Sequence, residues 1–276
     1  MITTRRQLRR DTLKALGDLR ILKATNVGDD QRFIDTLNLV AEVDAYRGRE
    51  VIFTGGTVAN LGQMRYVTGS SDEFRALGFG VSLPAATAVG DECEMVNTRG
   101  TMYRLADVHD AINQAIRAVG SQTLTPAGSD EQTYARGTAI EVPPEFRTVE
   151  SVQWLDAWDT TTWRSVPKAR RVNGPGWSVD RANRTVVISG DSAWNLNERT
   201  IVVRGLAEPS ELHDDSDTTT LDPEFLSTYA QALLAKAKFL RMPTPETERT
   251  MFALQQLAGS LRRKVVTRRG PFSTDI

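Results

Sequence analysis

The sequence predicts an α+β fold, in which a helical bundle carries an inserted small antiparallel β barrel or sandwich and a second, Trp-rich antiparallel β unit. Two observations predict this fold class. Apolar residues recur at helical spacing in four separate segments, and short strand-like runs between turn residues fill the two long intervals. Hydrophobic residues make up 40% of the 276 residues and charged residues 25%, which is ordinary for a chain with a packed core.

The first helix is expected over residues 4–19. One face of this segment is apolar or small, and arginines occupy the opposite face. The residues expected on the apolar face are Leu8, Thr12, Ala15, Leu16 and Leu19.

The second helix is expected over residues 105–119, and Gly120 follows where a glycine commonly ends a helix. Its apolar residues keep the spacing of one helical face. They are Val108, Ala111, Ile112, Ala115, Ile116 and Val119.

Two further helices are each introduced by a capping residue and a proline. Asp222-Pro223 opens the third helix, because aspartate caps free N–H groups and proline suits the first helical position. Thr244-Pro245 repeats this signal for the fourth. The apolar side of the third is expected to hold Phe225, Leu226, Tyr229, Leu233 and Leu240. The fourth has the spacing of a helix-on-helix seam, at Met251, Leu254, Ala258, Leu261 and Val265.

The two long intervals between the helices are predicted to contain short strands. In the first interval we expect strands at 49–54, 63–68, 78–83 and 91–96, a pattern typical of a small antiparallel barrel or sandwich. In the second we expect them at 139–142, 149–154, 177–179, 185–189 and 200–206. Residues 180–183 are expected to form a hairpin turn between two of these strands.

The predicted domain organisation follows from this order. Residues 1–20, 105–120 and 222–267 form the helical bundle, 21–104 the β insert, 121–221 the Trp-rich β unit, and 268–276 an extended C-terminal tail. Segments rich in small and polar residues are predicted to be flexible at 121–132, 210–220 and 268–276.

Charge is unevenly distributed along the chain although the formal net charge is −1. Residues 1–23 contain seven Lys or Arg and two Asp or Glu, and residues 238–276 contain eight and three. One interpretation is that these are solvated helix faces. The other is that the two basic ends meet in space and face an acidic partner or nucleic acid.

No residue pattern supports a catalytic or metal site, so the chain is predicted not to be an enzyme and to need no cofactor. His109 is interpreted as a solvated surface histidine and Cys93 as a half-buried strand residue. His213 lies in an acidic loop that is interpreted as solvated and mobile, with a hard-cation site as the alternative. A lone cysteine favours a reducing cytoplasm, and no apolar run reaches the roughly 18 residues of a membrane span.

The five tryptophans all fall within the second β unit, at Trp154, Trp158, Trp163, Trp177 and Trp194. Tryptophan is common in cores and protein interfaces, which is the favoured interpretation. Stacking on sugars or on nucleic-acid bases is the alternative.

Three segments carry a resemblance to a known family. Residues 105–119 read LADVHDAINQAIRAV, 139–152 read AIEVPPEFRTVESV, and 200–212 read TIVVRGLAEPSEL before LDPEF at 221–225. In this order they resemble the head-to-tail adaptor proteins of tailed bacteriophages, also called connector or neck proteins. Residues 46–54, 62–68 and 83–91 are similar to a small β module found in phage structural proteins.

The resemblance implies a viral structural protein of the virion neck, assembled in the host cytoplasm. Such a protein forms a homo-oligomeric ring, expected as a dodecamer, that docks under the portal protein and extends the DNA channel toward a downstream neck or tail protein. Another neck or tail ring protein (a stopper or a tail terminator) and a virion carbohydrate-binding module are the alternatives. No membrane partner is implied.

The family typically grips the portal with its C-terminal part. By this resemblance, portal docking falls here to the end of the fourth helix and the tail. The residues expected to dock are Arg262, Arg263, Lys264, Arg268, Arg269, Phe272 and Ile276. Their basic side chains suit an acidic protein rim or a phosphate backbone.

Overall fold

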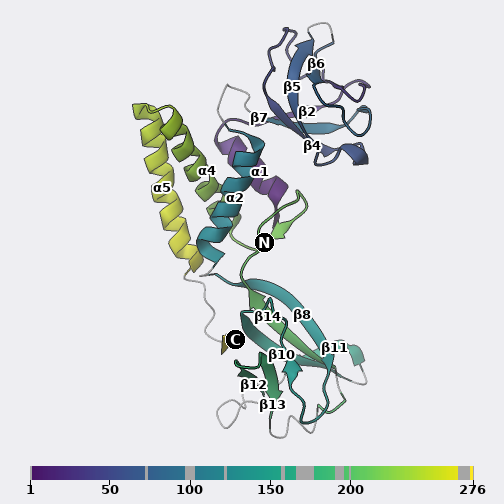
Figure 1. The fold of residues 1–276 in the computed structure, drawn as a ribbon, viewed down its shortest axis with the longest axis vertical. Helices are drawn as coiled ribbons and strands as arrows, with labels where there is room; N and C mark the ends of the chain where they lie inside the picture. Colours follow the sequence, from purple (N-terminus) through teal and green to yellow (C-terminus); the bar gives the residue numbers. More distant parts are fainter. Residues whose placement is uncertain are drawn as a thin grey trace. The chain divides into compact units, whose positions relative to one another are not determined.

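The computed structural model describes residues 2–71, 74–96, 103–120, 123–156, 159–165, 177–189, 196–198, 200–266 and 274–275. Within these residues the fold is mixed α and β, with four helices and several antiparallel sheets, none of them closed into a barrel. The chain divides into two compact units (Figure 1). Unit 1 comprises Met1–Arg117 and Glu211–Arg263, and unit 2 comprises Ala118–Ser210 and Lys264–Ile276.

The helices of unit 1 are α1 (Arg5–Ala15), α2 (Leu105–Gly120), α4 (Pro223–Arg241) and α5 (Pro245–Val266), and each begins close to its predicted start. Thr4 caps α1 by accepting a hydrogen bond from the backbone N–H of Gln7, and Asp222 caps α4 by accepting one from Glu224. The structure thus confirms the capping role predicted for Asp222.

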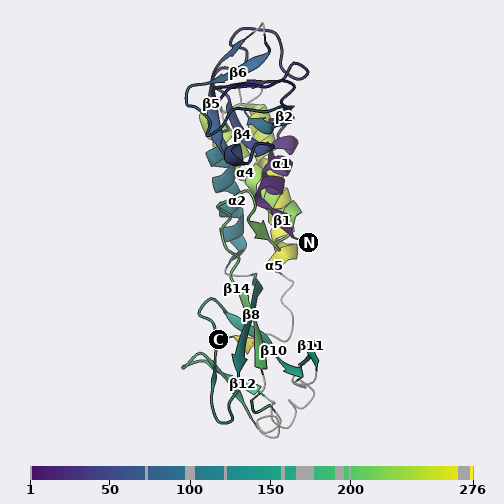
Figure 2. The same cartoon turned by 90° about the vertical axis from the view of Figure 1, so that its right-hand side faces the viewer.

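Burial follows the predicted helix faces closely. On α2 and α5 the buried residues include Val108, Ile112, Ala115, Ile116, Met251, Ala258, Leu261 and Val265. α1 packs against α4, and Figures 1 and 2 show the two helices side by side in both views. Three expectations are wrong: Ala15 of α1 and Leu240 at the end of α4 are exposed, and Arg9 of α1 is fully buried although arginines are expected on the solvent face.

The β insert of unit 1 forms one open sheet of six strands in the order β2-β7-β4-β5-β6-β3. The strands are β2 (Arg20–Lys23), β3 (Arg32–Ile34), β4 (Glu50–Gly55), β5 (Met64–Ser71), β6 (Ala76–Phe79) and β7 (Glu92–Val96). The sequence did not predict β2 and β3. The sheet is not closed into a barrel, and the expected barrel or sandwich is not confirmed. A bulge between Val67 and Gly69 interrupts the β5–β6 register.

The two faces of this sheet have different surroundings. On one face Leu22, Val51 and Cys93 belong to a closed apolar core that also contains Phe33, Phe53 and Phe79. Burial raises the pKa of the Cys93 thiol well above its usual value, as suits a core residue. Side chains alternate along a strand, so Glu94 points to the opposite face, where it meets α1.

Unit 2 contains two sheets. The larger has the order β11-β10-β14-β8, and β16 also pairs with β10; Figure 2 shows β8, β14 and β10 together. Its strands are β8 (Thr125–Thr133), β10 (Thr148–Asp156), β11 (Asp159–Ser165), β14 (Thr200–Ala207) and β16 (Thr274–Asp275). The smaller sheet joins β12 (Trp177–Asp180), β13 (Thr185–Ile188) and β9 (Ile140–Glu141).

Two of the segments predicted to be flexible have regular structure. Residues 125–133 form β8, which pairs with β14 along its whole length. Thr218–Thr219 form β15, which pairs with β1 (Thr3–Thr4). The hairpin turn predicted at 180–183 is confirmed, because Asp180 accepts hydrogen bonds from Ala182 and Asn183 between β12 and β13. Of the predicted tail, Thr274–Asp275 are described, as β16.

Candidate functional site

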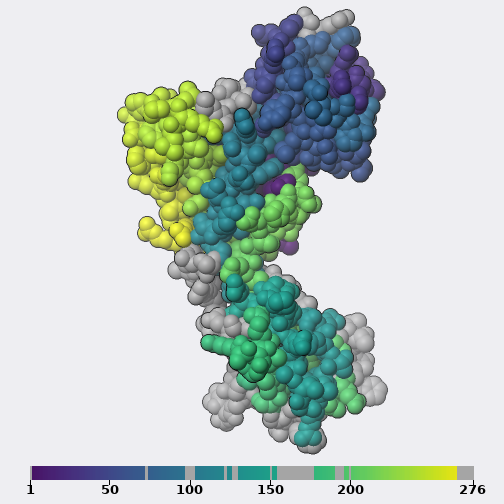
Figure 3. All heavy atoms as spheres, in the orientation of Figure 1, coloured from purple at the N-terminus to yellow at the C-terminus, as the bar shows by residue number. Residues whose placement is uncertain are grey.

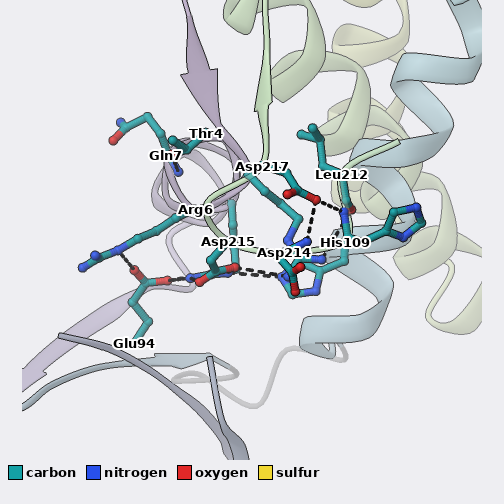
Figure 4. A network of polar contacts seen from close by, with 12 residues as sticks. Thr4, Arg6, Gln7, Glu94, His109, Leu212, Asp214, Asp215 and Asp217 are labelled. Atoms are coloured by element: carbon teal, nitrogen blue, oxygen red, sulfur yellow. Dashed lines mark hydrogen bonds and ion pairs between the residues drawn. The ribbon is translucent and has the colours of Figure 1, made fainter. Parts of the chain in front are cut away.

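A cluster of arginines and carboxylates joins α1, the β insert and the loop before α4 within unit 1 (Figure 4). α1 supplies Arg5, Arg6, Arg9 and Arg10. Their carboxylate partners are Glu92 and Glu94 of β7 and Asp215 of the loop. Four cations from one helix therefore meet anions from two segments that are far apart in the sequence.

Arg9 and Glu94 form the centre of this cluster, and the side chains of both are 0% exposed. Nε of Arg9 donates to Oε2 of Glu94 at 2.8 Å, and Nη2 donates to Oδ2 of Asp215 at 2.9 Å. Arg10 donates to the other carboxylate oxygen of Glu94. A guanidinium presents several N–H groups in a rigid plane, which lets Arg9 bind two carboxylates at once.

The pKa shifts show that the cluster favours the charged forms of Arg9 and Asp215. Burial would by itself lower the pKa of Arg9 and raise that of Asp215, but the hydrogen bonds and charges between them reverse both effects. The pKa of Arg9 is therefore raised and that of Asp215 is lowered, so both groups stay ionised at neutral pH. Through these ionised groups the cluster acts as a structural joint between α1, β7 and the loop before α4.

His109 borders this joint from α2. Its Nε2 lies 3.3 Å from Nη1 of Arg9, and burial together with the charges of Arg5 and Arg9 lowers its pKa to about 4. The histidine is therefore neutral at physiological pH and stays part of the packed interface. This corrects its interpretation as a solvated surface residue.

The acidic loop 212–217 is also anchored, which corrects its interpretation as solvated and mobile. The side-chain amide of Asn113 donates to the carbonyl of Leu212, and its oxygen accepts from the N–H of Leu212. Asp217 accepts hydrogen bonds from the backbone N–H groups of His213 and Asp214. Among the described residues, no group of three His, Cys, Asp or Glu side chains could hold a metal ion.

Four of the seven residues expected to dock lie outside the described residues: Arg268, Arg269, Phe272 and Ile276. The other three lie in the last turns of α5. Arg262 is half-buried, and Arg263 and Lys264 are exposed. The arginines of α1 are paired with carboxylates of their own unit, which corrects the interpretation of this helix face as solvated.

Only one of the five tryptophans has a described side chain. Trp177 is buried in the core of unit 2 beside Val186 and Ile188, so it offers no ring face to a sugar. Trp158 and Trp194 lie outside the described residues, and the side chains of Trp154 and Trp163 are not described.

The β insert exposes apolar residues that were not predicted from the sequence. Two segments, 54–64 and 80–90, contain no charged residue, and every exposed residue in them is Gly, Ala, Val, Leu, Met or Pro. We call their large exposed members the apolar platform: Val58, Leu61, Met64, Val81 and Val89. Uncharged stretches of this length are the feature of the sequence that indicates such exposed apolar segments.

Buried polar side chains hold the platform segments together. The amide of Asn60 bonds both the carbonyl and the N–H of Ala85, at 3.0 and 3.1 Å. The carboxylate of Asp91 accepts from the backbone N–H of Thr57 and of Ala88. Gly56 is needed at the turn, because its φ is +94° and a Cβ there would lie 2.0 Å from Asp91. The exposed side chains thus sit on a fixed backbone.

Comparison with known proteins gives no family for the chain. No protein-family model matches it, and no curated protein is similar to it. Within the described residues, no helix combines the length and apolar character needed to cross a membrane.

Proposed function

We propose that this chain is a phage virion structural protein of the head-to-tail adaptor type, which docks under a portal and extends its DNA channel toward the tail. The observation that carries the proposal is the element order. A helix, a β insert, a second helix, a β unit and two last helices follow one another as in the adaptor pattern. In this proposal the four helices act as one bundle and the two β units extend from it.

The surface chemistry supports a role in protein binding. Large apolar residues are exposed on the platform and elsewhere on the β insert, and interaction sites commonly expose such residues. The end of α5 presents Arg262, Arg263 and Lys264, which suit an acidic rim on a portal subunit. Among the described residues, His109 and the carboxylates of Glu94 and Asp215 contact Arg9 and hold elements of the fold together.

A charge-reversal experiment tests the docking role. Reversing Arg262, Arg263 and Lys264 together to Glu is expected to abolish co-sedimentation with the portal protein of the same phage, because like charges then face each other. Substitution is preferable to truncation: Val265 is buried and Thr274–Asp275 pair with β10, so removing residues 262–276 also removes packing.

Arg249→Glu is the matched control, because Arg249 is an exposed arginine near the other end of the same helix. It is expected to leave portal binding intact. If the triple variant is folded and still co-sediments with the portal as the parent chain does, the docking assignment is wrong.

A further inference from the structure

In the larger sheet of unit 2, strand β10 has one edge that two different strands share. Figure 3 shows the residues of this unit, coloured teal to green, gathered in one body. One edge of β10 pairs with β14 from Thr148 to Trp154. The other edge pairs with β11 from Gln153 to Asp156, and with β16 at Thr148 and Val149. A segment close to the C-terminus therefore covers the beginning of an edge that β11 reaches only from Gln153 onward.

The hold of β16 on this edge is short. β16 contributes only Thr274 and Asp275, whereas β8 pairs with β14 along Thr200–Ala207. Among the described residues, no strand pairs with 150–152 on this edge. Only alternate residues of an antiparallel strand bond the neighbouring strand on a given side, so a two-residue strand makes about two backbone hydrogen bonds. Two such bonds favour pairing by only about tenfold to hundredfold, so β16 can leave the edge.

The edge itself is held in place independently of β16. Val149 and Val152 are buried in the core of unit 2, and β14 pairs with β10 on its other side. Thr148 is also fully buried, and its hydroxyl has no hydrogen-bond partner among the described residues. It stands directly opposite Asp275 in the register. Unpaired backbone groups along such an edge are a template for an added strand.

The segment that supplies β16 has the sequence of an added strand. Pro271 lacks a backbone N–H, so a pairing strand is expected to begin after it. Residues 272–276 read FSTDI, in which Phe, Thr and Ile alternate with two polar residues. A second copy carries the identical segment. A strand that fits the edge of its own chain therefore fits the same edge of another copy, with the same backbone bonds.

We propose that the β10 edge at Thr148–Val152 binds the C-terminal strand of a second copy of this chain, in exchange for its own. Residues 267–273 separate α5 from β16, and so short a connection keeps the strand on its own edge in dilute solution. Neighbours in a ring are at comparable local concentration, and a strand passed from each copy to the next is a heterologous contact that can close. This role in a ring rests on the proposed function, but the exchange itself does not.

Disulfide trapping in the full chain, without any portal, tests the exchange. One variant carries Val149→Cys and the other Thr274→Cys, so neither can form the bond within its own chain. The native Cys93 is buried in the core of the β insert. The two substituted residues stand opposite each other in the register, at a separation that a disulfide can span. Oxidation of the mixture at about 1 mM, the range of effective concentration for short linkers, is expected to give disulfide-linked heterodimers.

Val187→Cys replaces Val149→Cys in the matched control, because Val187 is 38% exposed but lies on β13 in the other sheet. The heterodimer is expected to exceed this collision level about tenfold or more. An excess of a peptide of residues 268–276 is expected to suppress the heterodimer, because it competes for the edge. The same peptide with Thr274→Pro and Asp275→Pro is expected to have no effect, because proline has no N–H to donate.

Two further variants make the outcome decisive. Val149→Cys and Thr274→Cys in one chain are expected to close an intramolecular disulfide in dilute solution, which checks the register. Thr148→Cys with Asp275→Cys repeats the mixing at the adjacent pair, should the first substitution in the core unfold the chain. The proposal is overturned if the intramolecular bond does not form, if neither mixture exceeds the control, or if the peptide has no effect. Because portal is absent, these results are independent of the docking experiment.

Discussion

Arg9 is a charged side chain with no exposure to solvent, and it remains charged because Glu94 and Asp215 face it from two directions. Taking such charges out of water is costly, and only good geometry offsets the cost. Glu94 is the shared anion of this joint, since Arg6, Arg9 and Arg10 all contact it. The stability of the contact between α1 and β7 therefore depends strongly on the Glu94 side chain.

Replacing Glu94 by Gln is expected to lower the free energy of unfolding by about 3–5 kcal/mol, because the buried guanidinium of Arg9 loses one of its two anions and keeps only Asp215. Urea denaturation measures the change. Asp29→Asn is the isosteric control: it breaks the exposed pair with Arg32 and is expected to cost no more than about 0.5 kcal/mol. Equal effects of the two substitutions would contradict the structural role of the buried pair.

His109 makes the stability depend on pH. Its pKa is about 4 in the folded chain, against about 6.5 when unfolded. Between these values only the unfolded chain binds the proton, so acid favours unfolding and stability rises with pH through this window. The lowered pKa of Asp215 acts in the same direction at lower pH, where its protonation removes the partner of Arg5 and Arg9.

His109→Gln is expected to flatten the dependence of the urea midpoint on pH between about 6.5 and about 5. His213→Gln serves as the control, because this second histidine is exposed. An unchanged slope in the His109 variant would show that other groups cause the acid sensitivity.

At the scale of elements, two glycines show how the same substitution has opposite effects. In β14, a Cβ on Gly205 would lie 2.0 Å from the ring of Phe146, whereas a Cβ on Gly259 of α5 meets nothing within 4 Å. Gly205→Ala is expected to cost about 1–3 kcal/mol by overpacking. Gly259→Ala is expected to stabilise the chain by about 0.5–1 kcal/mol through helix propensity. Thermal unfolding checks both, and a shift of the same sign in both variants would contradict this account.

Elements with strong periodicity were predictable and those without it were not. The start and buried face of α2 follow directly from its apolar spacing, as does the start of α4 from Asp222-Pro223. β8 was missed because Pro126, Gly128 and Asp130 are typical of turns. It is a strand because β14 pairs with it residue by residue, which is a tertiary effect.

At the scale of the whole molecule, the basic residues of the chain lie in two kinds of surroundings. The basic residues of α1 are neutralised inside unit 1, while Arg262, Arg263 and Lys264 lie at the end of α5. Reversing these three residues tests the contact with a portal that the proposed adaptor role requires.

By itself the sequence determined the helices, most of the strands, and the order α, β, α, β, α, α. These features depend on residues close together in the chain, where spacing and capping act directly. The tertiary structure decided that Arg9 is buried, that the acidic loop 212–217 is anchored, and that segments 54–64 and 80–90 form one platform. Each of these depends on residues 25 to 210 positions apart, because only folding brings Asn60 to Ala85 and Arg5 to Asp215.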